Sequence, residues 1–128
     1  MPNPPLHLMD SVGPAIGAGV FVLLMSLVRE PTRLRVNALL VAGASGVYLS
    51  GGLGLWELLF PALLFPIVYR AQTSYRFVGI AWLLHAAWDV VHHLYANPIW
   101  PFIPTSSFGC MVFDTLIALW FLRLSRAA

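Results

Sequence analysis

The chain has 128 residues, of which 59% are hydrophobic and only 9% are charged, and its formal net charge is +2 at pH 7. Because soluble domains carry about 25% charged residues, this composition excludes an ordinary soluble domain and indicates one integral membrane domain over residues 1–128. We expect no nucleic-acid partner, because the arginines are not clustered with aromatic residues. The single cysteine, Cys110, excludes an internal disulfide bond.

The apolar runs of the sequence are long enough to predict five membrane-spanning helices. In chain order they cover residues 11–28, 34–51, 54–69, 75–95 and 108–123. The third run is short, at about 16 residues, which predicts a span that is tilted, pinched or partly interfacial. Three glycines before it, Gly51, Gly52 and Gly54, predict a tight turn. The predicted fold class is therefore an all-α, polytopic membrane helical bundle.

All seven basic residues are arginines, and their positions predict how the bundle is oriented. They are Arg29, Arg33, Arg35, Arg70, Arg76, Arg123 and Arg126. With five spans, all of them fall on the same side of the membrane, and the positive-inside rule assigns that side to the cytoplasm. The sequence therefore predicts a multi-pass protein of the cell membrane, as in a bacterial inner membrane, with the N-terminus outside and the C-terminus in the cytoplasm.

Ionisable residues interrupt the later spans. His85, Asp89, His92 and His93 lie in the fourth span and, at 100° per residue, fall within an arc of about 100° on one helix face. An acidic residue at a helix centre costs about 2.5–3.5 kcal/mol on insertion scales, so such groups normally face a protein interior or a cavity.

Glu57 begins the third span and Asp114 lies in the fifth. Counted along the helices, these acidic residues and those of the fourth span converge on the outer half of the bundle, opposite the arginines.

The leading hypothesis is a metal-dependent intramembrane enzyme, a hydrolase or an oxidoreductase, that acts on a lipid-like substrate. Histidine and carboxylate ligands suit zinc, iron or manganese. The candidate ligands are Asp89, His92, His93 and Asp114, and the candidate catalytic residues are Glu57, as general base, His85 and Asp89. His85 and His93 cannot bind the same ion, because they are about 12 Å apart along the helix.

Two other functions remain open. A metal-free isomerase would relay a proton through His85 and Asp89, and predicts an apolar pocket around His85 that is lined by Trp82 and Trp88. A transport or accessory subunit would need a homo-oligomer to form a pathway, and the apolar residues Val78–Ala81 of the fourth span argue against it.

Purely structural explanations are open as well. Glu57 could extend into the headgroups, and Asp114 could simply bond His85 or His92.

The segment from Asn97 to Ser107 joins the last two spans and contains three prolines and no charge. Prolines at every third position exclude a helix there. The segment is either a lid over the polar cavity or a rigid connector that ends in a helix N-cap at Ser106 or Ser107.

Several segments resemble a known family over nearly the whole chain. They include Arg29-Glu-Pro-Thr-Arg, Trp82-Leu-Leu-His-Ala-Ala-Trp-Asp-Val-Val-His-His, Asn97-Pro-Ile-Trp-Pro-Phe and Asp114-Thr-Leu-Ile-Ala-Leu-Trp. These stretches are similar to the DUF6010 family of small bacterial integral membrane proteins of unknown function. The resemblance implies the membrane class and topology but no reaction. The spacing of His85 and Asp89 is also similar, more loosely, to that of the five-span emopamil-binding sterol isomerases.

Overall fold

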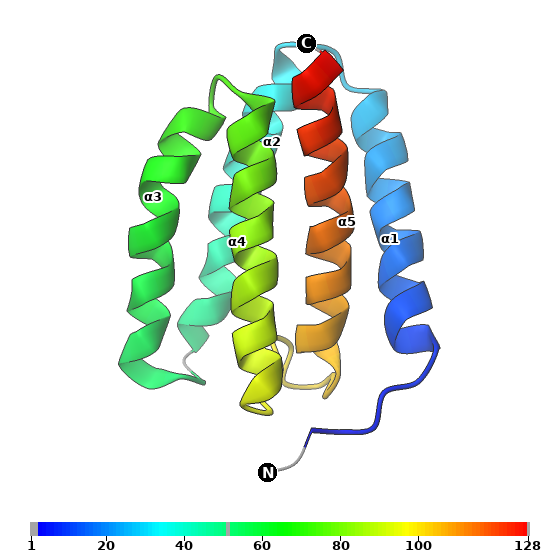
Figure 1. The fold of residues 1–128 in the computed structure, drawn as a ribbon, viewed down its shortest axis with the longest axis vertical. Helices are drawn as coiled ribbons and strands as arrows, with labels where there is room; N and C mark the ends of the chain where they lie inside the picture. Colours follow the sequence, from blue (N-terminus) through cyan, green and yellow to red (C-terminus); the bar gives the residue numbers. More distant parts are fainter. Residues whose placement is uncertain (1–2, 51, 128) are drawn as a thin grey trace.

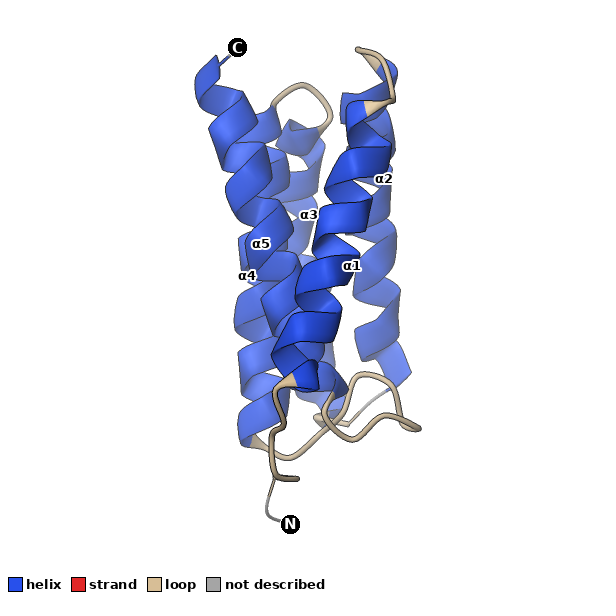
Figure 2. Ribbon diagram, turned by 90° about the vertical axis from the view of Figure 1, so that its right-hand side faces the viewer, coloured by secondary structure: helices blue, strands red, loops and turns tan. Residues whose placement is uncertain are grey.

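Helices account for all the regular structure in the part of the chain that the computed structural model describes, residues 3–50 and 52–127 (Figures 1 and 2). The α-helices are α1 (Met9–Ser26), α2 (Thr32–Gly43), α3 (Leu59–Ala71), α4 (Tyr75–Leu94) and α5 (Ser106–Ala127), and two 3-10 helices, η1 (Ala44–Ser50) and η2 (Gly54–Leu58), complete them. The prediction of an all-α fold with five helices is confirmed.

Three of these helices are long and apolar enough to cross a membrane, namely Met9–Ser26, Gly54–Ala71 and Ser106–Ala127. The other two depart from that pattern for identifiable reasons. Helix α4 has 20 residues but carries polar groups, and α2 is an α-helix of 12 residues that continues as η1. Membrane crossing by α2 and α4 therefore stays a prediction.

The change from α2 to η1 alters the backbone hydrogen bonding near the middle of the bundle. The Ser45 hydroxyl donates to the carbonyl of Ala42 at 2.7 Å, and such side-chain bonds compete with the helical ladder. Because the last carbonyls of an α-helix lack their usual N–H partners, that of Val41 becomes available to another helix. Further on, Gly54 has a φ of +63°, which suits the predicted glycine turn, whereas Gly51 lies outside the described residues.

Helix α4 lies between α3 and α5 (Figure 1). Helix α1 packs on α5, and α2 contacts both α3 and α4. The crossing of α4 and α5 is close because Gly79 has no side chain: a Cβ there would lie 2.7 Å from Leu122 Cγ and 3.2 Å from the Ala118 carbonyl oxygen.

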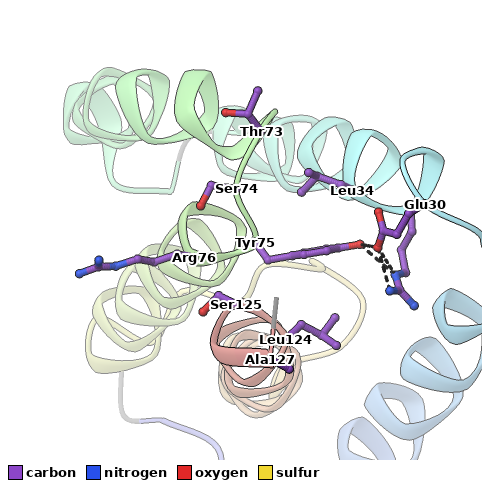
Figure 3. A pocket seen from close by; sticks show the side chains of 10 residues that line it. Glu30, Leu34, Thr73, Ser74, Tyr75, Arg76, Leu124, Ser125 and Ala127 are labelled. Atoms are coloured by element: carbon purple, nitrogen blue, oxygen red, sulfur yellow. Dashed lines mark hydrogen bonds and ion pairs between the residues drawn. The ribbon is translucent and has the colours of Figure 1, made fainter.

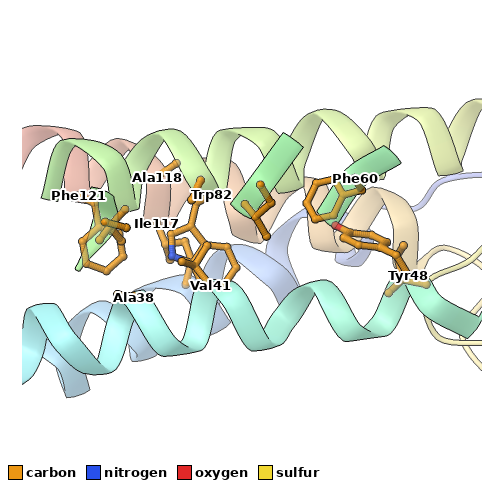
Figure 4. Packing of buried hydrophobic residues seen from close by; sticks show 14 residues of the cluster. Ala38, Val41, Tyr48, Phe60, Trp82, Ile117, Ala118 and Phe121 are labelled. Carbon is orange, nitrogen blue, oxygen red and sulfur yellow. The ribbon is translucent and has the colours of Figure 1, made fainter. Parts of the chain in front are cut away.

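An apolar layer fills the half of the bundle that includes the C-terminus. Its six residues have no exposed surface and come from three helices: Val41, Val78, Ala81, Ile117, Ala118 and Phe121 (Figure 4). Large hydrophobic residues also cover the outside of the molecule, where Leu23, Leu39, Phe65 and Leu119 are between 55% and 76% exposed. An apolar outer surface of this kind suits contact with lipid.

The loops after α1 and α3 lie at the same end of the bundle as the C-terminus, and the N-terminus lies at the other end (Figure 1). All seven arginines belong to that C-terminal end. There Arg33 forms an ion pair with Glu30, with Nη2 at 2.7 Å from Oε1, and its Nε is 2.9 Å from the Tyr75 hydroxyl.

The Tyr75 hydroxyl donates to Glu30, and Arg76 points away from this group (Figure 3). A cavity of about 630 Å³ adjoins it. The network ties the loop after α1 to the start of α4.

We expect Gly79→Ala to weaken the contact between α4 and α5. Overpacking of this kind typically costs about 1–3 kcal/mol, which would lower the midpoint of thermal unfolding in mild detergent by about 4–11 °C. Gly19→Ala is the matched control, because a Cβ at Gly19 meets no atom within 4 Å among the described residues. A Gly79→Ala protein as stable as the control would contradict the close crossing.

The Glu30 network also predicts a pH dependence of stability. Partial burial raises the pKa of the Glu30 carboxyl, but hydrogen bonds from Tyr75 and Arg33 outweigh burial and hold the pKa below its ordinary value. The unfolded chain therefore takes up the proton first, and the stabilisation is lost as the pH falls through the lowered pKa. We expect the unfolding midpoints of wild type and Glu30→Gln to differ at pH 6 and to converge towards about pH 3. A constant difference over this range would refute the assignment.

Candidate functional site

A polar stripe runs along one buried face of α4. His85, Asp89 and His92 are 1%, 0% and 3% exposed, and their spacing of four and three residues places them one above another on the helix. The stripe is thus turned into the protein, as the cost of placing such groups in lipid predicts. It takes part in two separate clusters.

The first cluster centres on a pair of carboxyl groups. Asp89 of α4 and Asp114 of α5 line the same cavity, their carboxyl groups are close enough to interact, and both side chains are buried. Two carboxyl groups can form a hydrogen bond only if a proton lies between them, because ionised carboxylates only accept. The interpretation that Asp114 bonds His85 or His92 is wrong, since Asp114 pairs with Asp89 instead.

Tyr48 of η1 joins this pair, and the sequence analysis did not identify it. Its hydroxyl donates to Asp89 Oδ1 at 2.6 Å and also lies 3.2 Å from His85 Nδ1. Its side chain is only 2% exposed and packs against Phe60 (Figure 4). The signal in the sequence was a tyrosine near the end of a predicted span, at the level of the acidic residues.

The backbone of α2 fixes the tautomer of His85. His85 Nε2 lies 2.8 Å from the Val41 carbonyl oxygen. Because a carbonyl only accepts, Nε2 carries the hydrogen and Nδ1 presents its lone pair to the Tyr48 hydroxyl. His85, Tyr48, Asp89 and Asp114 therefore form a continuous series of polar groups. The single hydrogen of the Tyr48 hydroxyl is donated to Asp89, so Tyr48 can donate to His85 Nδ1 only when Asp89 carries a proton itself.

A cavity of about 320 Å³ opens beside this series, and we call it the inner cavity. Its polar wall is formed by Tyr48, His85, Asp89 and Asp114, and much of the remaining wall is apolar, with Trp82, Ile99, Trp100 and Phe113. The pocket predicted around His85 is therefore present. The prediction that Trp88 lines it is wrong, because Trp88 belongs to the second cluster.

The second cluster surrounds Glu57, which is 2% exposed. Glu57 Oε1 lies 2.8 Å from His92 Nε2, and Glu57 Oε2 accepts from the Trp88 indole N–H at 3.1 Å. The Leu53 backbone N–H also donates to Oε1, at 3.2 Å. Glu57 thus lies inside the protein and not among headgroups. Its hydrogen bonds link η2 to α4, and we call this group of contacts the clasp. Glu57 is poorly placed as a general base, because both of its oxygens are already paired and it does not line the inner cavity.

The candidate metal ligands do not come together. Asp89 and Asp114 belong to the first cluster, His92 belongs to the second, and the His93 ring packs on Phe108 with centroids 5.7 Å apart. Among residues 3–50 and 52–127, no three His, Cys, Asp or Glu side chains are placed to hold one metal ion. The zinc, iron or manganese site thus stays a prediction to which the geometry gives no support.

The segment between α4 and α5 forms part of the inner cavity through Ile99 and Trp100. Two serines fasten it to α5: Ser106 Oγ accepts from the Trp100 N–H at 2.8 Å, and Ser107 donates to the Asn97 carbonyl. Thr105 fastens it to α1 by donating to Asp10 Oδ1 at 2.7 Å. The segment covers the cavity, and both serines bind its backbone.

A model of DUF6010, a family of unknown function, matches residues 9–127. The chain belongs to the DUF6010 family. No curated protein and no solved structure matches the chain. In this DUF6010 protein the matched range runs from the start of α1 to the end of α5, so it contains both polar clusters, the inner cavity and the segment that covers it.

We expect Glu57→Ala to destabilise the protein, because it leaves the buried His92 ring and two partly buried N–H groups, from Leu53 and Trp88, without their carboxylate. Buried groups left unpaired cost about 1–3 kcal/mol each, so the free energy of unfolding should fall by at least this amount. Leu58→Ala is the control, since the Leu58 side chain is 58% exposed. Equal unfolding midpoints for the two variants would rule out the clasp.

Proposed function

We propose that this DUF6010 protein crosses the cell membrane five times, with its N-terminus outside and its C-terminus in the cytoplasm. The separation of all seven arginines from the polar clusters supports this orientation through the positive-inside rule. The burial of the polar face of α4 supports its crossing, because the helix then presents mainly apolar side chains to lipid. One domain over residues 1–128 accounts for the whole bundle.

Within that bundle, the inner cavity is the site of acid–base chemistry on a lipid-like molecule, and the reaction is the migration of a double bond. The observation that carries the proposal is the Asp89–Asp114 pair, which presents one acid and one base to a mostly apolar cavity. Isomerisation needs no metal and no second substrate. A cavity that excludes water also strengthens the electrostatic action of the pair.

The proton balance of this reaction closes on the pair itself. The protonated carboxyl donates its proton to one carbon of the substrate double bond, and the ionised carboxylate removes a proton from the carbon adjacent to the other end. The double bond moves by one position, and the pair again holds one proton, now on the other carboxyl. Transfer of this proton from one carboxyl group to the other restores the starting state, and the proton exchanges with water after the product leaves and before the next substrate binds.

Tyr48 and His85 hold the carboxyl pair in position and can exchange a proton with it. The Tyr48 hydroxyl stabilises the ionised form of Asp89 through its 2.6 Å hydrogen bond. His85, held by Val41, keeps Nδ1 directed at Tyr48 and can accept a proton through it. The aromatic rings of Trp82 and Trp100 are suited to stabilise transient positive charge on the substrate.

The other two functions have less support. A metal-dependent hydrolase or oxidoreductase would need ligands that the described residues do not bring together. Transport would need a polar route to the arginine end, but the apolar layer around Val78 and Ile117 occupies that half of the bundle. The inner cavity is enclosed by elements of one chain, so the chemistry needs no homo-oligomer.

The test is deuterium incorporation from heavy water. Wild-type protein in lipid nanodiscs, incubated with a lipid extract of the bacterial host, should place one deuterium per turnover on carbon in at least one lipid, as measured by high-resolution mass spectrometry. General acid–base catalysis contributes about 10²–10⁴-fold, so Asp89→Asn and Asp114→Asn should each slow incorporation at least a hundredfold. Glu30→Gln, at the opposite end of the bundle, should leave the rate unchanged. Wild type that labels no lipid above the Asp89→Asn background would overturn the proposal.

A further inference from the structure

A second cavity, of about 340 Å³, lies between the start of α1, the segment after α4 and the start of α5. We call it the outer cavity. Three residues line both it and the inner cavity, namely Trp100, Cys110 and Phe113. The two spaces are therefore neighbours that share one wall of side chains.

The outer cavity lies at the contact between the start of α1 and the start of α5, beside the segment that joins α4 to α5. Met9, Pro14 and Ile103 give it an apolar lining, and Met9 and Ile103 are themselves exposed. Gly109 allows α5 to approach α1 closely, since a Cβ there would lie 3.2 Å from Pro14 Cγ. A molecule dissolved in the membrane can reach this cavity from the side without passing through water.

The combined space suits an elongated molecule. Ligand pockets measure about 300–1,000 Å³, so each cavity alone is at the lower limit of that range, whereas both together fall well inside it. Asp10, Thr105 and Ser106 also line the outer cavity, but each is already hydrogen-bonded within the protein. The buried carboxylate oxygen without a protein partner among the described residues, Asp89 Oδ2, lies in the inner cavity, and the remaining surface of the outer cavity is mostly apolar. A ligand that fills both would place its polar end inside and its hydrocarbon chain outside.

Charge limits what the polar end can be. The Asp89–Asp114 pair with one proton carries a negative charge, and all seven arginines are at the opposite end of the bundle. An anionic headgroup would therefore meet like charge in a low-dielectric site. In addition, Asp89 Oδ2 is buried and receives no hydrogen bond from any fixed donor among the described residues. A ligand O–H or N–H group would satisfy that oxygen.

We infer that the two cavities form one binding site, entered from the bilayer between α1 and α5, for a single-chain amphiphile whose polar end donates hydrogen bonds and carries no negative charge. The ligand class is thus a long-chain alcohol or amine and not a phospholipid or a fatty acid anion. This assignment rests on the proposed function, because it takes Asp89 and Asp114 as the reacting groups. Binding of the amphiphile can nevertheless be measured without any reaction.

Cys110 reports on this site, because it is the only cysteine of the chain and lines both cavities. The experiment follows its modification by N-ethylmaleimide in lipid nanodiscs, with intact-protein mass spectrometry as the readout. The probes are hexadecan-1-ol, hexadecylamine and hexadecyl sulfate, which share one chain length and differ in the polar end. We expect the alcohol and the amine to slow labelling at least fivefold and the sulfate to slow it less than twofold.

A control variant, Cys110→Ser with Gln72→Cys, moves the thiol to an exposed position just after α3, at the end of the bundle opposite both cavities. Its labelling should not respond to any probe, which excludes a general effect of amphiphiles on the reagent. Asp89→Asn with Asp114→Asn removes the negative charge, and the sulfate should then protect Cys110 as well as the alcohol does.

Equal protection by all three probes in wild type, or none, would overturn the inferred site. Selective protection without deuterium incorporation would support this site and overturn only the proposed isomerisation. Incorporation without selective protection would leave the isomerisation and overturn the shared site.

Discussion

The burial of the polar stripe on α4 is the constraint from which the rest of the arrangement follows. His85, Asp89 and His92 cannot face lipid without a cost of about 2.5–3.5 kcal/mol for each charged group, so α4 must be surrounded. Its neighbours each supply a partner for the stripe: α2 and η1 a carbonyl and a hydroxyl, η2 a carboxylate, and α5 a second carboxyl group. The rotation of α4 is thereby fixed by hydrogen bonding as well as by packing.

The two polar clusters differ in how completely their groups are paired. Around Glu57, both carboxylate oxygens have protein partners, and the cluster resembles the interior network of a structural element. Around Asp89, one oxygen is held by Tyr48 and the other lacks a fixed donor, and the pair forms part of a cavity wall. Incomplete pairing of a buried group is expensive, and it commonly marks a place where a ligand or a proton is meant to bind.

The sequence predicted the helices, the separation of the arginines from the acidic residues within the helices, and the inward face of α4, because hydropathy and helical spacing are local properties. It could not separate Glu57 and His92 from Asp89 and Asp114, since counting along the helices gives depth but not position around the bundle. Because this position around the bundle was missing, Asp89, His92, His93 and Asp114 suggested one metal site, with Glu57 beside it as the general base. The roles of Tyr48 and the Val41 carbonyl could not be predicted from the sequence. They depend on the change from α-helix to 3-10 helix between α2 and η1, and hydropathy does not indicate this change.

The change from α-helix to 3-10 helix at η1 makes this segment longer for its number of residues, which affects how it would fit a membrane. A 3-10 helix rises about 2.0 Å per residue against about 1.5 Å in an α-helix, so the seven residues of η1 extend about 14 Å where an α-helix would extend about 10 Å. The segment from Thr32 to Ser50 is thereby long enough for the proposed crossing of a hydrocarbon core of about 30 Å, with fewer residues than a uniform α-helix would need. Hydrophobic mismatch in a thinner bilayer would favour rewinding of η1, which would shift Tyr48 along the bundle axis relative to Asp89. In the proposed five-span arrangement, bilayer thickness and the geometry of the carboxyl pair are thus mechanically coupled through the seven residues of η1.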